Sequence, residues 1–130
     1  MIDIKDTFEI FCRKIGGNLE VFDKDFPTGL EKTYRCHAKL DNSNLTIEIT
    51  PSNGELVVRE SKGGKVHALQ TRLVYDSTCH IDEVENYVKF VCSSPEEPED
   101  TIVIGVEGNT LRRLKIYGTT GTITYKMIQL

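Results

Sequence analysis

Residues 34–40 read YRCHAKL and residues 45–49 read LTIEI, and these two runs decide the predicted fold. In each run apolar and polar residues alternate, which is the pattern of a β-strand with one buried face and one solvent-exposed face. Only the short polar segment 41–44 separates them, so we expect the two strands to pair as an antiparallel hairpin. The centre of the chain therefore predicts antiparallel sheet.

The same type of structure continues toward the C-terminus. Residues 51–54 (PSNG) form a strong turn signal, because proline presets the first central position and Asn-Gly accepts the positive φ of a reversal. A third strand is predicted at 55–60. Gly63-Gly64 then separates it from a long strand at 65–75, whose apolar residues occupy both faces. A β-bulge or burial on both faces would explain that distribution.

The N-terminal segment predicts a helix over residues 4–15. Its apolar residues recur at spacings of three, four and seven, which places them on one helical stripe. They are Ile4, Phe8, Phe11, Cys12 and Ile15. Asp3 is suited to cap the start, and Gly16-Gly17 supplies a left-handed exit. A short strand at 18–22 and a polar loop at 23–29 are expected next.

The segment 79–92 fits two structures. Ile81, Val84, Val88 and Val91 have helical spacing, and Asp82 with Glu85 resembles a capping box, which predicts a second helix near 80–92. The alternative is a strand over 85–92, because that stretch is rich in β-branched and aromatic residues.

The remainder of the chain predicts a solvated acidic loop followed by three strands. The loop covers 93–100, the strands cover 101–106, 111–117 and 122–130, and turns at 107–109 and 118–121 join them. The whole chain, 1–130, is therefore expected to form a single α+β domain. Its N-terminal helix and second helix would pack on a mostly antiparallel, strongly twisted sheet of about seven or eight strands, with barrel-like closure as the competing architecture.

Composition excludes several functional classes. The chain has 130 residues, 38% of them hydrophobic and 28% charged, with a formal net charge of -4. A net negative charge, the absence of tryptophan and only 8% aromatic residues disfavour nucleic-acid binding. No stretch resembles a secretory signal or a membrane span, so we expect no membrane association and a cytoplasmic location, with removal of a leader as the alternative.

The four cysteines are Cys12, Cys36, Cys79 and Cys92, and no two of them form a Cys-x-x-Cys pair. In a reducing cytosol they are expected to be buried thiols, whereas an exported protein would allow two disulfides. Cys36 and His37 should point to opposite faces of their strand, and no metal site or cofactor is predicted. Cys79, ahead of the expected second helix, is the one thiol placed like a nucleophile, but an inert thiol is the favoured interpretation.

Two cationic stripes are the candidate binding residues. The first is Arg35, His37 and Lys39, and the second is Arg112, Arg113 and Lys115. If their strands are neighbours, these side chains form a basic patch suited to an acidic partner or an anionic ligand.

The chain carries no phosphate-binding glycine loop, nucleophile elbow or metalloprotease motif, so no catalytic residue is predicted. We therefore expect a non-enzymatic protein-binding module, such as an inhibitor, immunity-type or adaptor protein, acting through a charged sheet face or an exposed strand edge. The alternative is a small-molecule-binding protein or hydrolase with a cavity between sheet and helices. The apolar C-terminal run 122–130 could also pair with a second copy as a homodimer.

Overall fold

The structure is a computed structural model, and it describes residues 4–73, 77–93, 101–116 and 124–129. Within them the chain forms one helix followed by strands. The elements are α1 (Ile4–Lys14), β1 (Asn18–Phe26), β2 (Gly29–Lys39), β3 (Asn44–Thr50), β4 (Glu55–Lys62), β5 (Lys65–Arg72), β6 (Thr78–Val84), β7 (Tyr87–Ser93), β8 (Thr101–Glu107), β9 (Thr110–Lys115) and β10 (Thr124–Gln129). The predicted α+β class with antiparallel pairing is confirmed, because every described strand pair is antiparallel.

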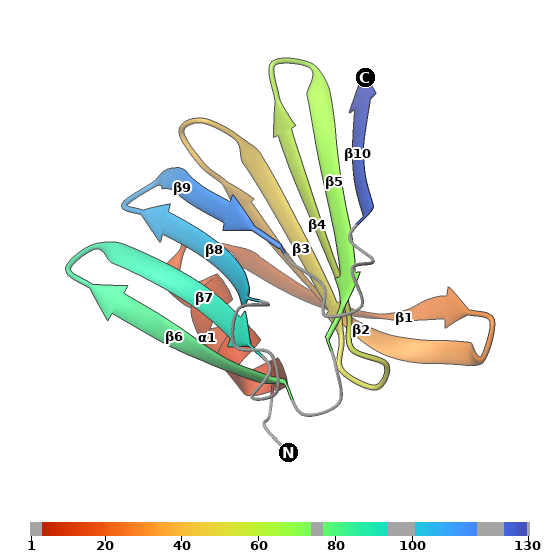
Figure 1. Cartoon of the computed structure of the whole chain (residues 1–130). Coiled ribbons are helices and arrows are strands. Elements are labelled where there is room, and N and C mark those ends of the chain that lie inside the picture. The colour runs from red at the N-terminus through yellow and green to blue at the C-terminus, as the bar shows by residue number, and fades with distance from the viewer. Residues whose placement is uncertain (1–3, 74–76, 94–100, 117–123, 130) are drawn as a thin grey trace.

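The strands form two sheets, so the prediction of one sheet of seven or eight strands, closing toward a barrel, is wrong. One sheet has six strands in the order β1-β2-β3-β4-β5-β10, and the other has four in the order β6-β7-β8-β9 (Figure 1). Twist accumulates with each added strand, so a large antiparallel set gains burial by splitting into two sheets that share one core.

The N-terminal helix is confirmed, and it joins the two sheets. α1 contacts β1 and β2 of the larger sheet and β6 and β7 of the smaller one. Phe8 and Phe11 are fully buried, and their ring centroids lie 6.1 and 5.5 Å from that of Phe90 on β7. The helix ends as expected, since Gly16 has a φ of +74° and the Gly17 amide donates to the Cys12 carbonyl.

The second helix near 80–92 is wrong, because this segment is the β6–β7 hairpin. Glu85 adopts a left-handed φ of 55° at the turn, which ends any helical path. Val88, Phe90 and Cys92 are buried at alternate positions, whereas Val84 of the expected helical stripe is 65% exposed. The alternating burial of a strand therefore determines the structure of this segment, although its apolar residues also have helical spacing.

The polar loop expected at 23–29 is also wrong. β1 and β2 pair continuously from Asn18↔His37 to Phe26↔Gly29, so the predicted loop is the tip of a long hairpin. The turn at 51–54 is confirmed, with Gly54 at a φ of +77°. Residues 94–100 of the predicted acidic loop and the turn at 118–121 lie outside the described residues.

All four cysteines form disulfides, which corrects the expectation of reduced thiols. Cys12 on α1 bonds to Cys36 on β2, and Cys79 on β6 bonds to Cys92 directly across the β6–β7 ladder. Each cysteine is at most 5% exposed, so their burial is as predicted. The first bridge fastens the helix to the larger sheet, and the second fastens the two strands of one hairpin to each other.

Candidate functional site

The β1–β2 hairpin extends beyond the sheet to which it belongs. β2 begins to pair with β3 only at Tyr34↔Ile49, so the end of the hairpin lies outside the pairing with β3. We call residues 23–32, which comprise the ends of the two strands and the turn between them, the arm. Figure 1 shows the arm projecting away from the other strands. Among the described strands β1 pairs with β2 alone, so its outer edge offers unpaired backbone groups.

One face of the β1–β2 hairpin carries exposed apolar side chains. Val21, Asp23 and Asp25 alternate along β1 and therefore share this face, and Leu30 joins them because it lies opposite Asp25. Val21 is 51% exposed and Leu30 is 67% exposed. An isolated exposed apolar residue is normal, but two on one face of a projecting hairpin provide contact area for another molecule.

The free edge is acidic. Glu20, Asp23 and Asp25 are all exposed. Within the described part of the chain, neither Asp23 nor Asp25 makes a hydrogen bond or an ion pair, and Glu20 comes only within 3.9 Å of the Arg35 guanidinium. Three carboxylates on one strand therefore face solvent, with Lys32 opposite Asp23 and Arg35 near Glu20 as the cations beside them.

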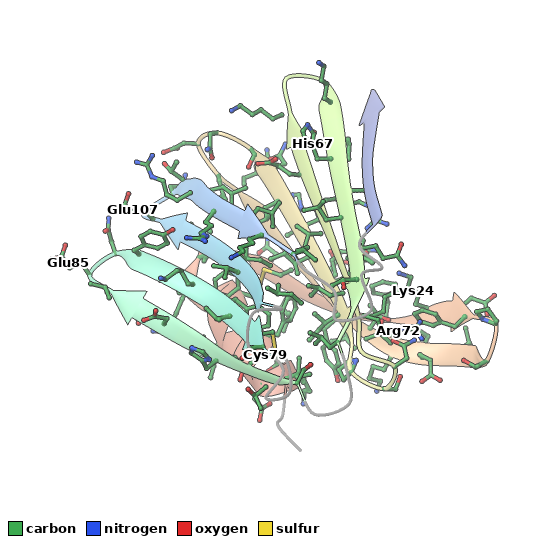
Figure 2. The ribbon with its side chains drawn as sticks, in the orientation of Figure 1. Lys24, His67, Arg72, Cys79, Glu85 and Glu107 are labelled. Carbon is green, nitrogen blue, oxygen red and sulfur yellow. A yellow bond between two sulfur atoms is a disulfide. The ribbon has the colours of Figure 1, made fainter. Side chains whose placement is uncertain are left out.

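The lysine of β1 is turned toward the body of the sheet. Lys24 Nζ donates to Glu55 Oε1 at 2.9 Å and lies 3.5 Å from Glu48 Oε1. It also lies over the Phe26 ring, 5.5 Å from the centroid. Figure 2 shows Lys24 where the hairpin leaves the sheet, and Glu85 and Glu107 at the turns on the opposite side of the molecule. Lys24 thus links the arm to Glu48 on β3 and Glu55 on β4 by ion pairs, and we call this set of contacts the clasp. The lysine therefore adds little positive charge to the free edge.

Glu48 is the centre of this clasp. Its side chain is 5% exposed, and it accepts a hydrogen bond from Arg35 Nε at 2.8 Å while Arg59 lies 3.5 Å away. Burial pushes the pKa of Glu48 upward, but the hydrogen bond from Arg35 and the positive charges of Arg59 and Lys24 outweigh it, so the pKa lies below its ordinary value. Glu48 is therefore held as a carboxylate by the cations around it, and its role is structural.

The first predicted stripe takes part in this network. Arg35 is held by Glu48, and its guanidinium carbon lies 4.4 Å from the Phe22 ring centroid. His37 Nδ1 lies 3.0 Å from the hydroxyl of Thr46, and Lys39 is exposed. Cys36 is buried on the other face, so the predicted opposition of Cys36 and His37 is confirmed.

The second stripe lies in the other sheet, so the two stripes are not on neighbouring strands. A β-bulge shifts the β8–β9 register between Gly105 and Val106 and leaves Arg112 and Arg113 both exposed. Arg112 Nε donates to Glu107 Oε1 at 3.0 Å. Lys115 follows at the end of β9. The condition for a single basic patch, adjacency of β2 and β9, is not met.

A shallow depression lies at the root of the arm. It has a volume of about 280 Å³ and is lined by Lys5, Glu31, Lys32, Tyr34, Pro51 and Ser52. Ser52 donates to the Glu31 carboxylate at 2.7 Å, and Lys5 Nζ lies 5.9 Å from the Tyr34 ring centroid. Its lining therefore combines two lysine ammonium groups with the Glu31 carboxylate.

The described residues form no metal-binding cluster. They hold no group of three or more histidine, cysteine or acidic side chains that could bind a metal ion. Cys79, which the sequence places like a nucleophile, is committed to its disulfide. No helix within the described ranges has the length and hydrophobicity to cross a membrane.

Sequence reasoning missed the arm, because the charges of residues 23–25 indicated a loop. The apolar residues Phe26 and Leu30 on either side of the turn were the available signal for a hairpin. Comparisons with protein families, curated proteins and solved structures find no match to this chain.

Proposed function

We propose that this protein is a non-enzymatic binding module that recognises an extended segment of a protein partner by adding it as a strand along the outer edge of β1. The observation that carries the proposal is the nine-residue edge strand, which pairs on one side only within the described strands. In strand addition the backbone supplies the hydrogen bonds, and side chains at alternate positions supply specificity.

Three further features of the hairpin support this use. β1 contains no proline and pairs with β2 in one uninterrupted register, so its edge can serve as a regular template. Val21 and Leu30 provide apolar contact on one face. The Cys12–Cys36 disulfide and the Lys24 clasp fix the root, so little ordering of the hairpin would be needed on binding.

Amide hydrogen exchange of the full chain tests the proposal, with partners captured from extracts of the source organism. In the free protein, the β1 amides that point outward should exchange quickly, and those bonded to β2 slowly. A bound partner should protect the outward set. Val21→Ser, which removes apolar contact without adding charge, should weaken capture, while Val84→Ser, at an even more exposed valine of β6, should not. The proposal fails if no partner is captured reproducibly, or if captured partners protect other surfaces and leave β1 unchanged.

The small-molecule alternative has one supporting observation, the depression at the root of the arm. At about 280 Å³ it falls slightly below the usual size of ligand pockets. Thermal unfolding in the presence of small organic anions would test this alternative. A rise in the unfolding temperature that disappears in Lys32→Gln would favour it.

We infer an oxidising compartment as the place of action. The expectation of a cytoplasmic location rested on the lack of a secretory signal, and reduced thiols were expected to follow from it, whereas both disulfides here are buried and together use every cysteine. Such bonds persist in exported proteins and are rare in the cytosol. Thiol titration of the denatured protein, purified under conditions that block exchange, should find no free thiol.

A further inference from the structure

We propose that the segment bound along β1 is basic, with lysine or arginine side chains at the positions opposite Asp23, Asp25 and Glu20. This inference rests on the proposed function and adds the chemistry of the partner. It depends on which β1 side chains stand free beside an incoming strand.

The positions of the charges along β1 set the pattern of the partner. Asp23 and Asp25 lie on the face of Val21, and Glu20 lies on the opposite face. A strand that pairs antiparallel to β1 would therefore place cations opposite Asp25 and Asp23, an apolar residue opposite Val21 and a further cation opposite Glu20. Opposite charges directly across an antiparallel ladder stabilise the pairing, whereas like charges destabilise it.

A nearby cation would weaken this preference. Lys24 of β1 is held by its own sheet, whereas Lys32 of β2 lies opposite Asp23 and makes no ion pair with a described residue. The Lys24 ammonium lies within 3.5 Å of both Glu55 and Glu48, and its side chain is 27% exposed. The lysine of β1 is therefore drawn toward its own sheet, and the three carboxylates of the edge outnumber Lys32, the cation opposite Asp23.

The same charges disfavour a second copy as the occupant. Pairing two β1 strands would bring six carboxylates together, and the lysine of each strand would already be committed to its own sheet. An acidic segment would meet the same repulsion. A basic segment is the occupant that the charges of the edge favour.

The test uses two fluorescent peptides and the full chain. One reads Lys-Thr-Lys-Thr-Val-Lys-Thr, which matches the pattern above, and the other has glutamate at each lysine position. We expect the lysine peptide to bind at least about tenfold more tightly by fluorescence anisotropy and to protect the outward β1 amides. Its affinity should fall as salt is raised, because the charges are exposed.

Neutral variants locate the effect. Asp23→Asn combined with Asp25→Asn should weaken the lysine peptide by about threefold to tenfold, since two cross-strand charge pairs are lost. Glu85→Gln removes an exposed charge at the β6–β7 turn and should leave the affinity unchanged.

The outcomes distinguish the two proposals. If a natural partner protects β1 but the glutamate peptide binds equally well or better, the basic chemistry is wrong and strand addition stands. If sedimentation shows a dimer whose formation protects β1, the occupant is a second copy and the basic partner is refuted. If nothing protects β1, the proposed function itself fails.

Discussion

The hairpins β1–β2 and β6–β7 are built alike and held differently. Each is an antiparallel pair at the edge of its sheet. The β6–β7 hairpin is fastened across its own ladder by Cys79–Cys92, and Glu83 on it is bound by Lys14 of the helix at 2.9 Å. The β1–β2 hairpin has its disulfide only at the root, and the arm beyond it is secured by Lys24.

This difference separates a scaffold from an exposed element. A hairpin fastened by a disulfide across its own strands has little freedom to open. A hairpin anchored at one end keeps its register yet presents both its edge and its apolar face to other molecules.

Removal of the root disulfide should have the largest effect. Cys12→Ala combined with Cys36→Ala opens a loop with a sequence separation of 24 residues, for which loop entropy predicts a loss of about 3.5 kcal/mol in the free energy of unfolding. Cys79→Ala combined with Cys92→Ala, with a separation of 13, should cost about 3 kcal/mol. Urea unfolding without reductant measures both. A larger loss of unfolding free energy from the second pair would show that Cys79–Cys92, not Cys12–Cys36, contributes more to stability.

Gly17→Ala should disturb the same Cys12–Cys36 disulfide by crowding its sulfur atoms. A Cβ at this position would lie 2.6 Å from the Cys36 sulfur and 2.8 Å from the Cys12 sulfur, so the bridge must shift. We expect a loss of about 2 kcal/mol, typical of overpacking, together with faster reduction of this disulfide. The matched control is Gly16→Asn, because the space beside Gly16 is open and asparagine tolerates its positive φ. Equal losses in the two variants would argue against crowding at the sulfurs.

Glu48→Gln should weaken the clasp and change the pH dependence of stability. Loss of a buried carboxylate with cationic partners should cost about 2 kcal/mol near neutral pH, partly offset because Arg35 and Lys24 can reach water. Because the pKa of Glu48 is lowered in the folded state, its contribution is complete above the ordinary glutamate pKa and is lost as the pH falls through the folded pKa. Urea unfolding from neutral to strongly acidic pH should therefore show the difference between wild type and variant shrinking in acid. A difference that stays constant would contradict the role of the charge.

Lys24→Met should have the smallest effect on global stability and a clear local one. The ion pair with Glu55 is partly exposed, so we expect a loss of about 1 kcal/mol or less. The amides of the arm should nevertheless exchange faster, while those of β6 and β7 keep their rates. Lys32→Met is the control, because Lys32 lies on the arm and makes no ion pair with a described residue. Unchanged exchange in the Lys24 variant would mean that the arm needs no clasp.

The sequence predicted most of the elements, because local patterns determine them. The stripe that includes Phe8 and Phe11 formed the helix, and the alternation in residues 34–40 and 45–49 formed paired strands in one sheet. Predictions failed where a distant contact decided the outcome. Val84 fits a helical stripe as well as a strand, and only the left-handed Glu85 and the facing β8 strand select the hairpin.

The candidate site was harder to predict for the same reason. The cations of the first stripe were correctly placed on the polar face, but their partner Glu48 became identifiable only when β3 was placed beside β2. The Asp23-Lys24-Asp25 run has loop composition and is nevertheless strand, because its residues alternate between exposed and only partly buried positions and none of them is apolar. Local polarity therefore does not distinguish a loop from a projecting hairpin.

The order of the six-stranded sheet has a consequence for the folding route. From β1 to β5 each strand lies beside the one before it in sequence, so this part of the sheet can grow by successive short reversals. β10 is different, because β5 ends at Arg72 and its second neighbour begins only at Thr124. During synthesis the outer edge of β5 cannot pair with β10 until that strand has left the ribosome. The intervening strands β6 to β9 can assemble into their own sheet before then. Of the ladders between described strands, the one between β10 and β5 is thus the last that can close.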